Sequence, residues 1–267
     1  MNKPELIRFN VRACGTQGGA PLLLLHGFMG CSADWKAVAS ALHGNRYILA
    51  FDLPGHGGTE VLSDEGYRVE RCAEELIGWL DQSGIDKCSA IGYSMGGRLA
   101  LHLAATFPDR FESIVVESAS PGLKGEEDRA ERRKSDAALI DKLRNGTLEE
   151  FIADWYRQPL FASLSTSPEI YEEMVKRRLR NKPEGLALSL AHMGAGAQES
   201  LWDQLGNISA RVMLVAGEYD AKYRTILGEA HGLIAGSKFA VVARTGHNTH
   251  LENPEGFLEV ANSFLEE

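Results

Sequence analysis

The 267-residue sequence lacks any apolar run long enough to cross a membrane, and runs such as residues 22–25 are far too short. Residues 1–5 carry none of the apolar character of a signal peptide. We therefore expect a cytoplasmic protein with no stable membrane association. The formal net charge of −9 argues against nucleic acid as a general partner, because phosphates attract basic surfaces. The sequence favours no particular oligomeric state.

Cysteine is scarce as well. The four cysteines show no C-x-x-C spacing and no pairing with histidine, which predicts neither a metal site nor a disulfide framework. The glycine-rich residues 55–58 lack the Lys-Ser/Thr pair and the strand-to-helix setting of a phosphate-binding loop. We therefore expect no metal ion and no other cofactor.

What the sequence does contain is an alternation of apolar strands and amphipathic helices. Strands are predicted at residues 6–13, 21–25, 46–51, 88–91, 113–117, 211–216 and 238–243, and helices at 32–42, 67–82, 223–233 and 254–265. Such alternation is typical of an α/β fold with a mostly parallel central sheet flanked by helices. Only helical patterns occur between about residues 121 and 198. We therefore predict a core of residues 1–120 and 199–267, with an inserted all-helical lid at 121–198.

Residues 91–98, Ile-Gly-Tyr-Ser-Met-Gly-Gly-Arg, place a Gly-x-Ser-x-Gly sequence between a predicted strand and a predicted helix. In this setting a tight turn presents the hydroxyl of Ser94 above the sheet. Glycine is needed on both sides, because a Cβ there would crowd the neighbouring strand and helix while the serine holds a strained backbone. The motif predicts a reactive serine.

An acid and a histidine follow Ser94 along the chain, each just after a predicted strand. Asp220 follows the strand at 212–216 and His247 follows the strand at 239–243. Serine, acid and histidine in this order are typical of α/β-hydrolase triads. The imidazole takes the serine proton, and the carboxylate orients the imidazole and stabilises its charge. Ser94, Asp220 and His247 are therefore the predicted catalytic residues.

Each partner of the serine has a competitor. Glu218 lies close to Asp220, and Glu117 could serve from an earlier strand. His250 competes with His247, but His247 directly follows Gly246 on the strand-exit loop, which favours it. The developing negative charge also needs preorganised donors. We expect these donors to be the backbone N–H groups of Met95, after the serine, and Phe28, after the buried strand.

Arginines point to an anionic ligand. Arg98 lies one helical turn after Ser94 on about the same face, where a cation can hold a substrate carboxylate bidentately. The alternative is an arginine on an exposed helix flank. The predicted lid adds further cations, most of which will be solvated: Arg129, Arg132, Arg133, Lys134, Lys176, Arg177, Arg178, Arg180 and Lys182. Trp155 in the same segment fits lid core better than a ligand platform.

Several segments carry a resemblance to known proteins. His-Gly-Phe-Met-Gly at 26–30, Asp-Leu-Pro-Gly-His-Gly at 52–57 and the serine motif resemble the α/β-hydrolase superfamily. More specific are residues 92–98, 117–123, 153–156, 161–164 and 246–250, together with Pro159. These are similar to the SHCHC synthase family of menaquinone (vitamin K2) biosynthesis, and the likeness spans nearly the whole chain.

The resemblance implies a lyase. Members of that family eliminate pyruvate from 2-succinyl-5-enolpyruvyl-6-hydroxy-3-cyclohexene-1-carboxylate, with the activated serine as a base. Carried over by position, the roles agree with the predicted triad and oxyanion donors, and the substrate-binding residues implied are Tyr93, Arg98, Arg132, Trp155 and Arg178. Spacing leaves Arg177 and Arg180 as alternatives to Arg178.

Three functions remain open from the sequence. The first is this lyase, acting on a small polycarboxylate. The second is a serine hydrolase that cleaves an ester or carbon–carbon bond of a carboxylate-bearing substrate through a covalent acyl-serine. The third is a non-catalytic ligand receptor, which the complete set of Ser94, Asp220 and His247 disfavours.

Overall fold

The computed structural model describes residues 5–267, and within them seven strands form one central sheet in the order β2-β4-β3-β6-β7-β8-β9. Strand β2 pairs antiparallel with β4, and every other pairing in this sheet is parallel. In chain order the strands are β2 (Val11–Gly15), β3 (Ala20–Leu25), β4 (Arg46–Phe51), β6 (Cys88–Tyr93), β7 (Phe111–Glu117), β8 (Arg211–Gly217) and β9 (Lys238–Val242). A small antiparallel sheet joins β1 (Ile7–Arg8) to β5 (Glu60–Val61).

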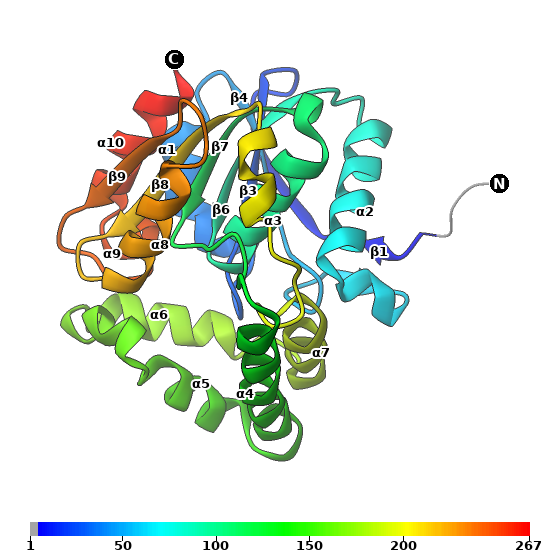
Figure 1. The fold of residues 1–267 in the computed structure, drawn as a ribbon, viewed down its shortest axis with the longest axis vertical. Helices are drawn as coiled ribbons and strands as arrows, with labels where there is room; N and C mark the ends of the chain where they lie inside the picture. Colours follow the sequence, from blue (N-terminus) through cyan, green and yellow to red (C-terminus); the bar gives the residue numbers. More distant parts are fainter. Residues whose placement is uncertain (1–4) are drawn as a thin grey trace.

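Helices cover both faces of the central sheet (Figure 1). On one face lie α1 (Lys36–Leu42) and α10 (Pro254–Leu265), and on the other α2 (Val69–Gln82), α3 (Met95–Thr106) and α8 (Ala221–His231). Successive leucines of β3 point to opposite faces, so Leu22 packs in one apolar cluster and Leu23 in the other. This explains why that strand is a continuous apolar run.

Four further α-helices lie between β7 and β8 in the chain and form a layer at one end of the sheet (Figure 1). They are α4 (Glu126–Asn145), α5 (Leu148–Tyr156), α6 (Pro168–Arg178) and α7 (Pro183–Met193). The 3-10 helix η4 (Pro159–Thr166) joins α5 to α6. We call α4 to α7, with η4, the inserted helices. The predicted α/β architecture with a helical insertion is confirmed, whereas lid boundaries at 121 and 198 stay a prediction.

Short helices complete the chain at η1 (Ser32–Trp35), η2 (Asp64–Tyr67), η3 (Pro108–Arg110), η5 (Trp202–Asn207) and α9 (Thr249–Glu252). The prediction of one strand at residues 6–13 is wrong, because extended pairing is interrupted around Asn10 and two separate strands, β1 and β2, form instead. There the Asn10 side chain donates to Asp52 at 2.6 Å. Helix α8 begins two residues earlier than predicted, because the Asp220 side chain accepts a hydrogen bond from Tyr223 N and caps it.

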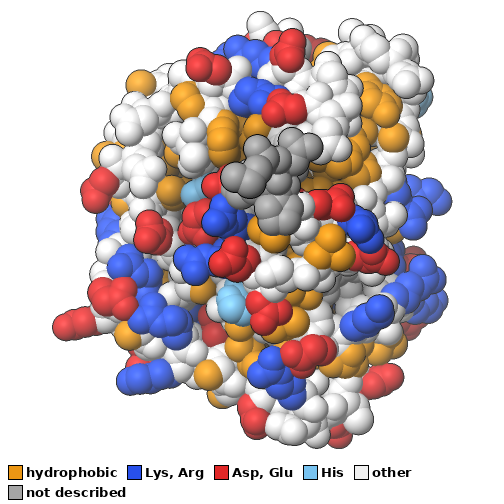
Figure 2. Space-filling model, turned by 90° about the vertical axis from the view of Figure 1, so that its right-hand side faces the viewer, with side chains coloured by type: hydrophobic (Ala, Val, Ile, Leu, Met, Phe, Trp, Pro, Cys, Tyr) orange, Lys and Arg blue, Asp and Glu red, His pale blue; other side chains and the backbone are white. Residues whose placement is uncertain are grey.

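On the face shown in Figure 2, acidic and basic side chains are interspersed and form no large patch of one sign. Many are exposed ion pairs such as Arg71–Glu74 at 2.8 Å, which contribute little to stability. No helix within residues 5–267 is long and apolar enough to cross a membrane. Positive side chains outnumber negative ones instead in a cavity between Ser94 and the inserted helices.

Candidate active site

Ser94 occupies a sharp turn between β6 and α3. Its backbone has φ 50° and ψ −107°, a region that non-glycine residues rarely adopt. The strain is held in place because the Ser94 N–H donates to the Glu117 carbonyl at 2.8 Å, and the Ser94 carbonyl accepts from Arg98 N at 3.0 Å. The turn therefore fixes the hydroxyl relative to the sheet before any ligand binds.

Glycines close this turn as the sequence predicts. A Cβ on Gly92 would lie 2.4 Å from the Gly96 carbonyl oxygen, and one on Gly96 would lie 2.1 Å from the Leu25 carbonyl oxygen. Both positions face backbone, which cannot move aside as a flexible side chain would. Strand β3, the turn and α3 can approach this closely only with glycine at these positions.

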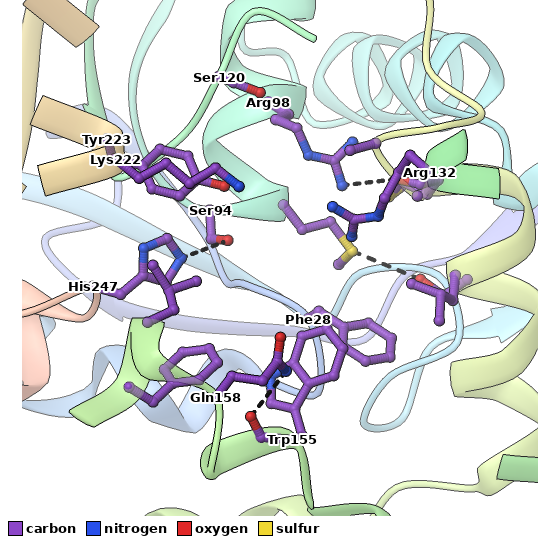
Figure 3. A pocket seen from close by; sticks show the side chains of 18 residues that line it. Phe28, Ser94, Arg98, Ser120, Arg132, Trp155, Gln158, Lys222, Tyr223 and His247 are labelled. Carbon is purple, nitrogen blue, oxygen red and sulfur yellow. Dashed lines mark hydrogen bonds between the residues drawn. The ribbon is translucent and has the colours of Figure 1, made fainter. Parts of the chain in front are cut away.

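The structure brings the three predicted catalytic side chains together (Figure 3). His247 Nε2 lies 3.2 Å from Ser94 Oγ, and His247 Nδ1 lies 2.7 Å from Asp220 Oδ2. His247 and Asp220 are buried, with exposed fractions of 2% and 3%. Because Asp220 accepts a hydrogen bond from the Nδ1–H group, Nε2 carries no proton and can accept the one from serine. This geometry suits proton transfer from serine to histidine.

The competing acid and histidine form a separate buried pair. His250 Nδ1 lies 2.7 Å from Glu117 Oε2, and Glu117 also accepts from the Thr249 hydroxyl at 2.7 Å. The His250 ring stacks on Trp35 with centroids 4.1 Å apart. This pair therefore fastens the loop after His247 to the core. Glu218, the other candidate acid, accepts instead from Arg244 N at 2.7 Å on the surface.

The two expected oxyanion donors both line the cavity in front of the serine. Within residues 5–267, the backbone N–H of neither Phe28 nor Met95 has a hydrogen-bond partner. Met95 is the first residue of the 12-residue helix α3, so its N–H also lies at the positive end of a helix dipole. The pair is arranged to receive negative charge that develops beside Ser94.

Two buried histidines shape the loop that carries Phe28. His56 Nε2 accepts from Met29 N at 2.9 Å, and His26 Nε2 accepts from Leu53 N at 2.9 Å. Each ring donates its Nδ1 proton to a carbonyl. Burial lowers the pKa of His26 and lowers the pKa of His56 to about 3. Both rings are therefore neutral at physiological pH, as an acceptor at Nε2 requires.

The cavity has a volume of about 140 Å³, and Figure 3 shows its lining side chains. Ser94 and His247 lie on one side of the cavity. Arg98 and Arg132 lie on the other side, and the rings of Trp155 and Phe28 form its floor. Sequence reasoning missed several lining residues, among them Ser120, Gln158, Ser189, Lys222 and Tyr223. Among these, a sequence signal exists only for Lys222 and Tyr223, which lie two and three positions after the acid Asp220.

The cavity contains more positive than negative charge. Arg98 donates to Gln198 Oε1 at 2.6 Å and to the Met193 carbonyl at 2.8 Å, and no carboxylate within residues 5–267 pairs with it. Burial lowers the pKa of Arg98 to about 10, which leaves it charged at neutral pH. Arg132 pairs with the buried Asp136 at 2.7 Å. A carboxylate ligand would therefore meet a desolvated cation whose nearest opposing charge, Asp136, is paired directly with Arg132 and not with Arg98.

The aromatic candidates have different places. Trp155 lines the cavity and packs on Phe28, with ring centroids 5.0 Å apart. Tyr93 lies behind the cavity, with its ring centroid 5.4 Å from that of His247 and 5.1 Å from that of His250. The structure therefore brings Trp155 to the ligand space and places Tyr93 against the catalytic histidine.

The structure does not bring Arg178 to the cavity. Its guanidinium is buried, donates to Asp34 Oδ2 at 2.7 Å and to the Tyr156 hydroxyl at 3.1 Å. Arg177 donates to the other Asp34 oxygen at 2.7 Å, and Arg180 is exposed. Arg177 and Arg178 therefore join the end of α6 to η1 in the core.

The site can move a proton and stabilise an oxyanion with its own side chains and backbone. Within residues 5–267, no group of three or more His, Cys, Asp or Glu side chains could hold a metal ion. The four cysteines are unpaired: Cys14, Cys31, Cys72 and Cys88. That the reaction needs no cofactor stays a prediction.

Comparison with known proteins places this geometry in a family. Residues 20–254 match the alpha/beta hydrolase fold family. The 2-succinyl-6-hydroxy-2,4-cyclohexadiene-1-carboxylate synthase of Salmonella agona (strain SL483) is 35% identical over 246 residues, 91% of this chain and 93% of its own. A Bacillus subtilis (strain 168) protein, provisionally named as the same synthase, is 37% identical over 97% of this chain and 95% of its own. The structure of MenH from S. aureus superposes with a TM-score of 0.91, at 32% identity and 97% coverage of both chains.

Proposed function

Because the chain belongs to the alpha/beta hydrolase fold family and, within it, to the 2-succinyl-6-hydroxy-2,4-cyclohexadiene-1-carboxylate synthases, we propose that it is a pyruvate-eliminating lyase of menaquinone biosynthesis. Its substrate is 2-succinyl-5-enolpyruvyl-6-hydroxy-3-cyclohexene-1-carboxylate. Its products are pyruvate and the cyclohexadiene carboxylate for which the relatives are named.

Proton abstraction at the ring starts the reaction. His247 accepts the Ser94 proton, and Ser94 Oγ removes the proton from ring carbon 2, between the succinyl carbonyl and the ring double bond. The electron pair of that C–H bond forms a new double bond, the ring double bond shifts, and the C–O bond at carbon 5 breaks. The departing group is the enolate of pyruvate, which takes up one proton at its methylene carbon in place of the proton removed from the ring. It thereby becomes pyruvate, and no water is consumed.

Charge stabilisation makes this proton removable. As the C–H bond breaks, negative charge spreads onto the succinyl carbonyl oxygen. The N–H groups of Phe28 and Met95, unpaired in the structure, receive that oxygen. Loss of one such donor in other enzymes costs about 2.7–4 kcal/mol of transition-state stabilisation.

The remaining roles follow from where the side chains lie. Arg98 and Arg132 bind substrate carboxylates, and Trp155 packs against the ring. Tyr93 supports His247, and Arg178 anchors the inserted helices; both act through neighbours and not on the substrate. Residues 121–198 act as the lid that covers the ligand. A cytoplasmic location, and the lack of a nucleic-acid or membrane partner, stay predictions.

The observation that carries this proposal is the triad of Ser94, His247 and Asp220 facing a cavity with a half-buried cation, Arg98, that has no salt-bridge partner within residues 5–267. The purified protein should release one pyruvate per substrate, followed with lactate dehydrogenase and NADH. A serine hydrolase would instead turn over carboxylate-bearing esters through an acyl-serine. Absence of pyruvate, together with a trapped acyl group on Ser94, would contradict the lyase.

A further inference from the structure

Three cations line the cavity, and they are held in different ways. Arg98 is fixed by Gln198 and the Met193 carbonyl, and Arg132 by Asp136. Within residues 5–267, the Lys222 ammonium has neither a hydrogen bond nor an ion pair. Two of the cations are therefore held by polar partners, whereas the third contacts an aromatic ring, that of Tyr223.

Lys222 approaches the cavity from the side of the triad. It is the second residue of α8, two positions after Asp220, and its ammonium lies 5.5 Å from the ring centroid of Tyr223. That ring lies 4.7 Å from the His247 ring, between centroids. Figure 3 shows the Lys222 side chain extending into the space beside Ser94, whereas Arg98 and Arg132 reach in from the other side. A ligand beneath the serine is therefore flanked by cations on both sides.

The electrostatics favour an anion at Lys222. Burial and the nearby Arg132 guanidinium lower the pKa of Lys222. The ammonium is therefore less stable in its charged form than a free lysine, and a carboxylate beside it would restore that stability. The desolvation reaches only part of this side chain, because Lys222 as a whole residue is exposed while both arginines are half-buried. Lys222 is therefore also the most accessible of the three.

In the proposed reaction, one substrate carboxylate leaves with pyruvate while the other two stay on the product, so the cations that bind them have different tasks. By its name the substrate has three carboxylates, on the ring, on the succinyl chain and on the enolpyruvyl group. The product keeps the first two, and the third departs in pyruvate. A group that leaves needs a partner that can bind it and then release it.

We propose that Lys222 binds the carboxylate of the enolpyruvyl group, the fragment that departs as pyruvate, while Arg98 and Arg132 hold the two carboxylates that the product retains. This assignment rests on the proposed function. A fixed guanidinium suits bidentate binding of a carboxylate that stays, whereas a mobile ammonium acts as a point charge on a flexible stem. Lys222 is thus a substrate-binding residue specific for the leaving group.

Binding of the two product halves can be measured separately. The probes are pyruvate itself and 2-succinylbenzoate, the aromatic analogue that keeps both product carboxylates. NMR titrations would give the dissociation constant of 2-succinylbenzoate alone, and that of pyruvate in protein saturated with 2-succinylbenzoate. The variants are Lys222→Gln, Arg98→Gln and the control Lys134→Gln, whose side chain is 77% exposed on α4.

Lys222→Gln should weaken pyruvate binding about tenfold or more and leave 2-succinylbenzoate within about twofold. Arg98→Gln should weaken 2-succinylbenzoate, and Lys134→Gln should change neither constant. An unchanged pyruvate constant in Lys222→Gln, or an equal loss for both probes, would overturn the assignment. A wild-type protein that binds both probes but releases no pyruvate from substrate would refute the proposed function instead, which keeps the two failures distinct.

Discussion

Among single residues, one group transfers the proton and a different group binds the carboxylates of the substrate. The hydrogen bonds of His247 to Ser94 and Asp220 serve proton transfer, and of these three residues Ser94 and His247 line the cavity. Arg98 and Lys222 hold charge without hydrogen bonds to this triad. Substitutions in the two groups should therefore affect different kinetic constants.

Replacement of Ser94 by alanine should lower kcat by about 10²–10⁴-fold and leave KM nearly unchanged, because general-base catalysis is lost while the carboxylate contacts remain. The variant should melt like the wild type, since only one half-buried hydroxyl is removed. Ser135→Ala, at an exposed position on α4, is the matched control. A change confined to KM would show that Ser94 binds substrate without acting as the base.

The pH dependence should report the charge on Lys222. Its pKa is lowered by burial and by Arg132, so the ammonium deprotonates at a lower pH than an ordinary lysine. A cation loses its charge as the pH rises, and kcat/KM should accordingly fall on the alkaline side, at a lower pH than an ordinary lysine would give. Lys222→Arg should move this fall to higher pH, because a guanidinium stays protonated there. An identical alkaline limb in both proteins would assign the titration to another group.

Between elements, a buried ion pair joins the inserted helices to the core. The side chains of Arg178 on α6 and Asp34 on η1 are 3% and 4% exposed and lie 2.7 Å apart. Arg177 shares the carboxylate. Burial raises the pKa of Asp34, but both guanidiniums oppose this effect, and the net pKa lies below its usual value. The pair is therefore charged at neutral pH, and loss of one partner leaves a charge buried.

Arg178→Met should lower the free energy of unfolding by up to about 3–5 kcal/mol, because Asp34 then keeps only the more exposed Arg177 as a charged partner. Arg180→Met, at the exposed end of the same segment, should change it by less than about 0.5 kcal/mol. Urea denaturation measures both. Addition of Asp34→Asn to Arg178→Met should recover part of the loss, since the incompletely paired buried carboxylate is then gone. A variant of wild-type stability with a raised KM would instead support the substrate-binding role implied by the family resemblance.

At the scale of the whole molecule, the sequence predicts best what local patterns encode. The continuous leucines of β3 predicted a strand, and the periodicity of α10 predicted a helix. Both predictions lie within one residue of the observed bounds. The serine turn followed from its glycines, and the order of Asp220 and His247 along the chain indicated which strand ends would meet. These features depend on neighbours in sequence or on the general rules of parallel sheets.

Other features depend on partners far away in the sequence. Asn10 divides the first predicted strand because its side chain donates a hydrogen bond to Asp52. Arg178 turns away from the ligand because Asp34, 144 positions earlier, accepts a hydrogen bond from its guanidinium. Lys222 resembles any lysine at a helix start, and only the folded chain places it in the cavity. No spacing rule on one sequence reveals such long-range pairings.

The cavity is small for its proposed ligand, and this predicts motion of the inserted helices. Its volume of about 140 Å³ lies below the roughly 300–1,000 Å³ typical of ligand sites. Trp155 on α5 and Arg132 on α4 line it, so a shift of these helices would enlarge it. We therefore expect substrate to enter an open form and the helices to close over it.

Hydrogen exchange can detect this closure. With 2-succinylbenzoate at 100 times its dissociation constant, any opening that expels the ligand costs about 2.7 kcal/mol more than in the free protein. Amides of α5 that exchange through this opening should therefore slow by about 100-fold. The last turn of α10, on the opposite side of the sheet from α3, frays without opening the cavity and should not change. Equal exchange rates in α5 with and without ligand would mean that the inserted helices do not gate the site.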